Sequence, residues 1–161
     1  MPLCPLIPPS ISTRIKVNLT AYPEEIIENF PTIKSLEIQQ GGHDKPKTCT
    51  ARYKVGIVVP YRDRIENLKL FLNHIHPFLN KQQIEYAIYI VEPVQNVTFN
   101  RGLLMNIGFN EAMKETDKWD CFIFHDVDLL PEDERNIYGC SEIPRHFSSA
   151  VSTLNYKYKP N

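Results

Sequence analysis

Three apolar runs of strand-like composition alternate with two segments of helical periodicity, and this alternation restricts the fold more than any other feature. The runs are 53–60 (YKVGIVVP), 86–93 (YAIYIVEP) and 119–128 (WDCFIFHDVD). The helical segments are 61–79 and 100–116. Nearly continuous apolar strands are typical of a sheet that is buried on both faces. The order strand, helix, strand, helix, strand predicts an α/β fold with a right-handed, doubly wound, mostly parallel Rossmann-like sheet.

Each helical segment carries an apolar face. In the first segment the apolar residues recur at helical spacing, at Ile65, Leu68, Leu72, Ile75 and Leu79. Pro77 is expected to end or kink this helix, because proline has no backbone N–H to donate. In the second segment the residues expected to face inward are Leu103, Leu104, Ile107 and Met113.

The remaining sequence predicts loops and short elements around these strands. With 161 residues the chain is expected to form one domain. Residues 1–20 are rich in proline and should be irregular, whereas 23–30 (PEEIIENF) reads as a short helix. Segments 39–49 and 129–144 are expected loops, and 148–153 (SSAVST) is an expected last strand.

Charged residues follow each of the three apolar runs. Asp126 and Asp128 end the third run, Arg62 and Arg64 follow the first, and Arg101 follows the second. Ligands of open α/β sheets bind beyond the carboxyl ends of the strands, so these side chains should converge on one crevice. Arginines suit phosphate oxygens, and carboxylates suit Mg²⁺ or Mn²⁺. The pattern predicts a site for a metal-bound phosphate ester.

A less specific interpretation of these charges stays open. An Asp-x-Asp pair alone is a weak signal, since most copies lie in solvated turns or caps. Arg62 and Arg64 could instead pair with Asp63 and Glu66 on a helix surface. The apolar residues that precede Asp126 argue for a buried strand end, where a carboxylate is costly unless it is bound.

The histidines are expected to be structural. His125 precedes Asp126, and a His-Asp pair can bind metals. In an alternating strand, however, His125 points away from the crevice that Asp126 faces, which favours a packed histidine. His74 and His76 read as residues on the face of a helix.

Charge and cysteine content narrow the possible partners and compartment. The net charge of −1 gives no support for a nucleic-acid partner, and no apolar run approaches the ~20 residues that span a bilayer. The four cysteines allow three pairings. The sequons at Asn18 and Asn96 would be glycosylated in a secretory lumen. Together, the even cysteine count and the sequons favour an oxidising compartment.

As a set, the motifs resemble the invertebrate members of the β-1,4-galactosyltransferase family. The matching stretches are KVGIVVPYRDR, LNHIHPFLNKQQIEYAIYIVE, FNRGLLMNIGFNEAM, CFIFHDVDLLPEDERNIYGC and PRHFS. They cover most of 41–151 in the family's order and spacing. The resemblance implies a GT-A fold, with 1–50 as an N-terminal family segment and 51–161 as the nucleotide- and metal-binding half of the glycosyltransferase domain.

The same resemblance implies a set of site residues. Asp126, Val127 and Asp128 would be the metal-binding Asp-x-Asp motif, with Asp128 as the Mn²⁺ ligand. The residues that would line the UDP-sugar site with this motif are Pro60, Tyr61, Arg62, Arg64, Phe99 and Arg101. The implied disulfides are Cys4–Cys49 and Cys121–Cys140. Tyr61 and Asp63 replace a Phe and an Asn that some members carry.

The implied activity is Mn²⁺-dependent transfer of Gal or GalNAc from a UDP-sugar to the 4-hydroxyl of a terminal GlcNAc or Glc acceptor. Family members are type II membrane proteins of the Golgi with a lumenal catalytic domain, so membrane contact would come only through an anchor absent from this chain. The chain also ends before the family's acceptor-binding and catalytic-base segment. It is therefore expected to be a fragment with no catalytic residue of its own.

Two further functions stay open at this stage. The chain could be a non-catalytic UDP-sugar-binding or interaction module. It could also be a metal-dependent phosphohydrolase built on His125 and Asp126.

Overall fold

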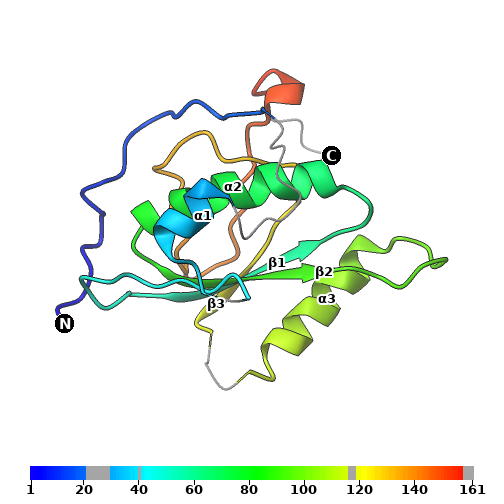
Figure 1. Cartoon of the computed structure of the whole chain (residues 1–161), viewed down its shortest axis with the longest axis horizontal. Helices are drawn as coiled ribbons and strands as arrows, with labels where there is room; N and C mark the ends of the chain where they lie inside the picture. The colour runs from blue at the N-terminus through cyan, green and yellow to red at the C-terminus, as the bar shows by residue number, and fades with distance from the viewer. Residues whose placement is uncertain (21–29, 40, 116–118, 158–161) are drawn as a thin grey trace.

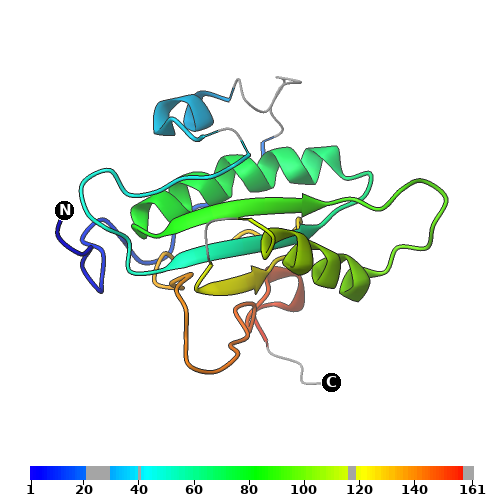
Figure 2. The ribbon, with the colours of Figure 1, turned by 90° about the horizontal axis from the view of Figure 1, so that it is seen from below.

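The computed structural model describes residues 1–20, 30–39, 41–115 and 119–157, and its centre is a sheet of three parallel strands. The strands are β1 (Lys54–Pro60), β2 (Glu85–Val91) and β3 (Cys121–Phe124). Their order is β2-β1-β3, and both pairings are parallel, so the three arrowheads point the same way (Figure 2). The predicted α/β class and parallel sheet are confirmed.

The central strand β1 is buried along almost its whole length, and its side chains alternate between two faces. Val55, Ile57 and Val59 belong to the main hydrophobic core. Val58 instead points to the opposite face, where it lies close to Gly108. Burial on both faces explains why the run is continuously apolar rather than alternating.

One helix covers each face of this sheet. Helix α2 (Ile65–Lys81) lies on the side of the main core and is accompanied by the short α1 (Pro31–Leu36). Helix α3 (Arg101–Ala112) lies on the other side (Figure 1). Two helices on opposite faces, each connecting parallel strands, are the doubly wound arrangement that the sequence predicted.

Helix α2 follows its predicted apolar face with two differences. Leu68, Ile75 and Leu79 are buried in the core, but Ile65 at the start of the helix is 48% exposed. Pro77 does not end the helix, which continues through it to Lys81. Pro77 cannot donate a backbone hydrogen bond within the helix. Packing of the helix on the sheet offsets this loss.

The predicted inward face of α3 is largely wrong. Only Leu104 of the four expected residues is buried, whereas Leu103, Ile107 and Met113 are 54%, 41% and 56% exposed. The helix turns its small residues toward the sheet instead, with Gly108 and Ala112 one and two turns beyond Leu104. Small side chains let a helix backbone approach a strand closely, so packing distance here overrides apolar content.

Several smaller elements also differ from prediction. No strand forms at 148–153 in the described part of the chain; a single 3₁₀ turn, Ser152–Leu154, ends this stretch, and its backbone bonds close locally. The third strand is shorter than expected, because the chain leaves the sheet after Phe124. The expected helix at 23–30 lies outside the described residues apart from Phe30, and α1 was not predicted. The division of the chain near residue 50 stays a prediction.

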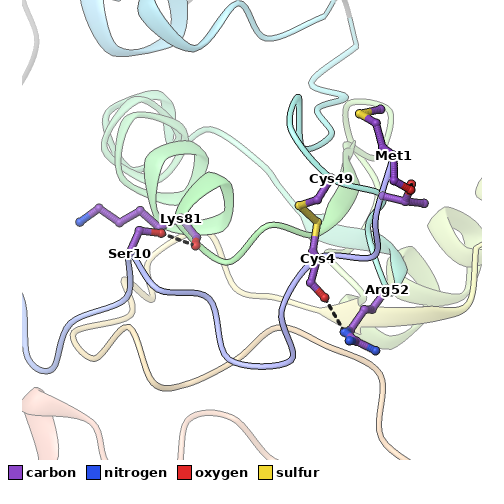
Figure 3. The surroundings of a disulfide bond; sticks show 7 residues. Met1, Cys4, Ser10, Cys49, Arg52 and Lys81 are labelled. Atoms are coloured by element: carbon purple, nitrogen blue, oxygen red, sulfur yellow. Dashed lines mark hydrogen bonds between the residues drawn. A yellow bond between two sulfur atoms is a disulfide. The ribbon is translucent and has the colours of Figure 1, made fainter.

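The N-terminal segment is fastened to the body of the fold at several points (Figure 3). Cys4 forms a disulfide with Cys49, and the Arg52 side chain donates to the Cys4 carbonyl at 2.7 Å. Further along, the Ser10 hydroxyl donates to the carbonyl of Lys81 at the end of α2 at 3.0 Å. This irregular segment therefore runs from the residues that precede β1 to the carboxyl end of α2, and it forms no helix or strand of its own.

Close packing of α3 on the sheet makes Gly108 sensitive to substitution. A Cβ at this position would lie 2.5 Å from Val58 Cγ1 and 2.6 Å from Val91 Cγ2. We expect Gly108→Ala to destabilise the fold by about 1–3 kcal/mol in chemical denaturation, despite the better helix propensity of alanine. The matched control is Gly102→Ala in the same helix, where the nearest atom is 3.8 Å away and no loss is expected. Equal stability of the two variants would contradict this packing.

Candidate functional site

The carboxyl ends of the three parallel strands and the first residues of both large helices meet at one edge of the molecule. Arg64 is the N-cap residue of α2, at the end of the short segment that follows β1, and Arg101 is the first residue of α3, after β2. Asp126 and Asp128 follow the end of β3. Helix N-termini and arginines both favour anions, so this edge combines positive potential with two carboxylates.

Arg101 and Asp126 form a bidentate ion pair. Arg101 Nε donates to Asp126 Oδ1 at 2.7 Å, and Nη2 donates to Oδ2 at 2.8 Å. The Asn100 side chain caps the helix by accepting from the Leu103 N–H, which fixes where α3 begins and hence where Arg101 lies. The alternation of β3 places Phe122 and Phe124 on the α3 face, and Asp126 reaches the same side. The pair is partly exposed, which leaves both groups accessible to a ligand.

Arg64 and Asp128 form a second ion pair beside the first. Arg64 Nη1 donates to Asp128 Oδ2 at 2.8 Å, and both side chains are about half exposed. Glu66 pairs with Lys69 at 3.2 Å. The predicted convergence of Arg64 and Arg101 on the two aspartates is therefore what the structure has, and the helix-surface alternative does not describe Arg64.

Arg62 lies beside these pairs but does not contact either aspartate. Its guanidinium stands over the ring of Phe99, with 5.5 Å between the guanidinium carbon and the ring centroid. Its Nη2 is buried and has no hydrogen-bond partner within the part of the chain described here. A buried, unpaired donor of positive charge is unfavourable, and an anionic ligand would satisfy it. Phe99 is 42% exposed, so its ring is available for stacking.

The other predicted site residues support the backbone of this edge. Pro60 is the buried last residue of β1, and the Tyr61 N–H donates to the Val91 carbonyl at 2.9 Å. Val127 is only 5% exposed and packs in the main core. These residues position the chain around the arginines and aspartates rather than presenting functional groups of their own.

His125 is a buried structural residue, as the sequence predicted. Its Nδ1 lies 2.8 Å from the Asp126 carbonyl oxygen, and its Nε2 lies 2.9 Å from the Tyr138 hydroxyl. Burial lowers the pKa of His125, against the opposing effect of the Asp126 carbonyl and the two nearby carboxylates. Burial also raises the pKa of Tyr138. Both groups are therefore neutral near pH 7.

The other two histidines considered in the sequence, His74 and His76, lie on α2, and neither reaches Asp126 or Asp128. His74 bonds to the Pro131 carbonyl at 2.8 Å. His76 is 2% exposed and bonds to the Tyr86 hydroxyl at 2.7 Å, and burial lowers the pKa of His76 to about 4. It is thus a core residue of the helix rather than a surface one.

The donor set suits a hard divalent cation only in part. Asp126 and Asp128 supply carboxylate oxygens, the ligand type that Mg²⁺ and Mn²⁺ prefer. The described residues contain no group of three or more His, Cys, Asp or Glu side chains that could hold a metal. Such a site fits a cation that takes its remaining ligands from elsewhere, as Mg²⁺ does when it is bound through one or two carboxylates and substrate phosphates.

A disulfide and a buried carboxylate fix the loop that follows the aspartates. Cys140 is bonded to Cys121 at the start of β3, which closes the loop back onto the strand. Glu134 is 1% exposed; its Oε2 accepts from the Ser12 N–H and hydroxyl, and its Oε1 accepts from Lys81 Nζ at 2.6 Å. Both disulfides are the pairs that the family resemblance implied.

Sequence reasoning missed the supporting residues of this loop. Tyr138 is buried next to His125, and its N–H donates to Gln82 Oε1 at 2.9 Å. Gln82 Nε2 in turn donates to the carbonyls of Glu134 and Asn136, both at 3.1 Å. Tyr, Gln and Glu in a polar stretch carry no periodicity, so no local pattern marks them as buried. The Cys121–Cys140 disulfide that the family resemblance implied was the available signal that this stretch is held in place.

Comparison with known proteins places this arrangement in a defined class. Residues 4–141 match the N-terminal region of glycosyl transferase group 7. The chain is 45% identical over 154 residues to human β-1,4-galactosyltransferase 6 and 44% identical over 157 residues to human β-1,4-galactosyltransferase 5. These alignments cover 95% of this chain but only 40% and 39% of the two relatives. The chain therefore spans about two fifths of the length of the curated relatives it matches.

A solved structure agrees with these matches. The crystal structure of a Drosophila β-1,4-galactosyltransferase 7 mutant, in complex with manganese, UDP-Gal and xylobiose, superposes with a TM-score of 0.50 and 36% sequence identity. It covers 61% of this chain and 38% of the Drosophila chain. The fold and these matches together define an α/β protein of the GT-A glycosyltransferase type. The chain belongs to the glycosyl transferase group 7 family, and it is similar to the β-1,4-galactosyltransferases within it.

The Glu134 network gives the loop a stability that depends on pH. Burial raises the pKa of Glu134, but the hydrogen bonds from Lys81 and Ser12 lower it more, and the pKa in the folded chain lies below its ordinary value of 4.5. A carboxylate whose pKa is depressed by folding stabilises the fold above its ordinary pKa, and this contribution is lost as the pH falls through the folded pKa.

We expect Glu134→Gln to destabilise the chain by about 1–3 kcal/mol at pH 7, because the amide cannot accept from all three donors. The difference from wild type, measured by urea denaturation, should shrink as the pH falls below 4.5. Glu111→Gln is the control, because Glu111 of α3 makes an exposed pair with Lys114 just beyond the end of that helix, and it should cost less than about 0.5 kcal/mol. A pH-independent loss for Glu134→Gln would show that its charge is not what matters.

Proposed function

We propose that this chain binds the diphosphate of a UDP-sugar through its arginines and aspartates, as part of a glycosyltransferase. The transfer would move Gal or GalNAc to the 4-hydroxyl of a terminal GlcNAc or Glc. The observation that carries the proposal is the pairing of Asp126 with Arg101 and of Asp128 with Arg64 at the carboxyl edge of the sheet. Family membership supplies the reaction class, and the site supplies its binding chemistry.

The arginines supply the contacts that a diphosphate needs. Arg64 and Arg101 are about half exposed and converge from the starts of two helices, and Arg62 offers a buried unpaired Nη2. Guanidinium groups bind phosphate oxygens through paired hydrogen bonds. Phe99, which has Arg62 over its ring, is 42% exposed, and an exposed aromatic side chain suits the stacking of a uracil ring.

The aspartates supply the contacts that a cation on that diphosphate needs. Asp128 is the proposed ligand of Mn²⁺, and Asp126 and Val127 complete the motif. A divalent cation at this position would stabilise the negative charge of the departing UDP. In the structure the two arginines neutralise the carboxylates. On binding, Arg64 and Arg101 would transfer their hydrogen bonds from carboxylate to phosphate oxygens, so that neither charge type is left unpaired.

The identities of donor and acceptor rest on the relatives rather than on this chain. The Drosophila relative was solved with UDP-Gal and xylobiose, which supports a UDP-sugar donor and a sugar acceptor. GalNAc as the transferred sugar and GlcNAc or Glc as the acceptor follow from the family resemblance. We assign no catalytic base to this chain, so we expect it to bind the donor nucleotide rather than to turn it over.

We further propose that the protein works in the lumen of the Golgi. Two disulfides suit an oxidising compartment, and the sequon residues Asn18 and Asn96 are both exposed, as glycosylation requires. Among the described helices, none combines the length and apolarity needed to cross a bilayer. Any membrane anchor is thus proposed on family grounds alone.

A non-catalytic UDP-sugar-binding module remains the second candidate, because the described residues offer groups for nucleotide and cation binding and we assign no catalytic base among them. The phosphohydrolase hypothesis has no such support. It required His125 to act with Asp126 in the crevice, but both ring nitrogens of His125 are engaged with the Asp126 carbonyl and the Tyr138 hydroxyl.

Nucleotide binding tests the proposal directly. In calorimetric titrations of the chain, UDP should bind only when Mn²⁺ is present. Replacing Arg62, Arg64 or Arg101 by Ala should weaken that binding by about 1.5–3 kcal/mol, the range for hydrogen bonds to charged groups. Asp128→Asn should abolish the UDP binding that Mn²⁺ supports. The chain should stay folded, because the substitution removes a charge at nearly constant volume.

Arg135→Ala is the control for these variants, since Arg135 pairs with Asp133 on the exposed loop and should not affect UDP binding. Three neutral arginine variants, or UDP binding that ignores Mn²⁺, would refute the assigned site. Hydrolysis of a simple phosphate ester by the wild-type chain would favour the phosphohydrolase.

A further inference from the structure

We propose that His125 and Tyr138 position the turn that carries Asp126 and Asp128, through a neutral imidazole that bears its proton on Nδ1. The role is one of positioning: neither residue would touch the metal or the nucleotide. The inference rests on the proposed function only for its effect on ligand binding, because the hydrogen-bonded arrangement itself can be measured without any ligand.

The partners of His125 fix its tautomer. A backbone carbonyl can only accept, so the 2.8 Å contact with the Asp126 oxygen requires a proton on Nδ1. The neutral ring then has a lone pair on Nε2, which accepts from the Tyr138 hydroxyl at 2.9 Å. His125 is 8% exposed and Tyr138 is 2% exposed, so neither contact can be replaced readily by water.

The contact acts at the point where the chain leaves the sheet. The His125 N–H donates to the Val58 carbonyl at 2.9 Å, which is the last backbone bond between β3 and β1. Beyond it, the Asp126 carbonyl also accepts from the Leu129 N–H at 3.2 Å and so closes the turn over 126–129. The imidazole thus holds the Asp126 carbonyl, which starts this turn, and the turn carries both aspartates.

The other side of the imidazole is anchored in the core. The His125 ring packs on Phe71 of α2 with 5.0 Å between ring centroids, and Tyr138 packs edge-on against Phe78 of the same helix. The Tyr138 N–H is held by Gln82 at the end of α2. Tyr138 and His125 therefore fix the position of the aspartates relative to α2.

Two amide variants separate the two hydrogen bonds. In His125→Asn the side-chain amide nitrogen can occupy the place of Nδ1 and keep the bond to the Asp126 carbonyl. In His125→Gln the amide reaches the place of Nε2, so that it keeps a contact with Tyr138 and loses the carbonyl. A merely structural role predicts equal effects, since both variants replace a buried ring with a smaller amide.

The first measurement needs no ligand. Long-range ¹H–¹⁵N spectra of the imidazole should show the Nδ1–H tautomer in the wild-type chain, and amide hydrogen exchange should show a protected Leu129 N–H. His125→Gln should speed the exchange of Leu129 by about 10-fold or more relative to His125→Asn. An Nε2–H tautomer, or equal exchange in the two variants, would overturn the proposal.

The second measurement uses UDP and Mn²⁺ as probes. His125→Gln and Tyr138→Phe should lower the affinity for UDP in Mn²⁺ by about 10- to 100-fold, the range for residues that orient a metal ligand, while His125→Asn stays closer to wild type. Affinity that follows only the unfolding stability of the variants would overturn positioning. If the wild-type chain binds no UDP at all, the proposed function fails, and the tautomer and Leu129 exchange still decide the role of His125.

Discussion

The parallel pairing of β1 with a strand on each side is the constraint on which the rest of the structure depends. At the centre of the sheet, Ile57 of β1 lies opposite both Ile88 of β2 and Ile123 of β3. Because all three strands run the same way, their carboxyl ends reach the same edge, and each chain segment that follows must leave from there. Two of these segments lead into α2 and α3, and the third is the turn with the aspartates.

The geometry of the site follows from this edge and from the alternation of β3. Ile123 faces the main core with α2, so Phe124 faces α3 and is left 47% exposed. Continued past the strand, the same alternation sends His125 into the core and Asp126 toward Arg101. One residue therefore anchors the turn while its neighbour presents a charge, and the costly burial of a carboxylate is avoided.

Sequence patterns predicted the elements whose packing depends on apolar content. The continuous run in β1 and the helical spacing in α2 both predict burial. Asp126 was assigned to the crevice from its place at the carboxyl end of a strand, and strand alternation separated it from His125. Sequence patterns failed where the distance between two backbones decides which face of a helix is buried. Gly108 and Ala112 bring α3 onto Val58, and no count of apolar residues favours that face over Leu103 and Ile107.

Long-range polar contacts were equally hidden from the sequence. Tyr138 and Glu134 lie in the loop that the Cys121–Cys140 disulfide closes, and they are buried where this loop meets Gln82 at the end of α2. The expected strand at 148–153 failed for a related reason. A strand is stable only beside another, and no described strand lies next to this segment, so its backbone closes a local turn instead.

We propose above all that the paired aspartates and arginines at the sheet edge form a site for a divalent cation and a diphosphate. Anomalous X-ray diffraction from crystals of the chain grown with Mn²⁺ and UDP tests it most directly. We expect a manganese peak within about 2.5 Å of an Asp128 carboxylate oxygen. We also expect Arg64 and Arg101 to contact the diphosphate instead of the carboxylates. A manganese peak elsewhere, or UDP bound while both ion pairs persist unchanged, would contradict it.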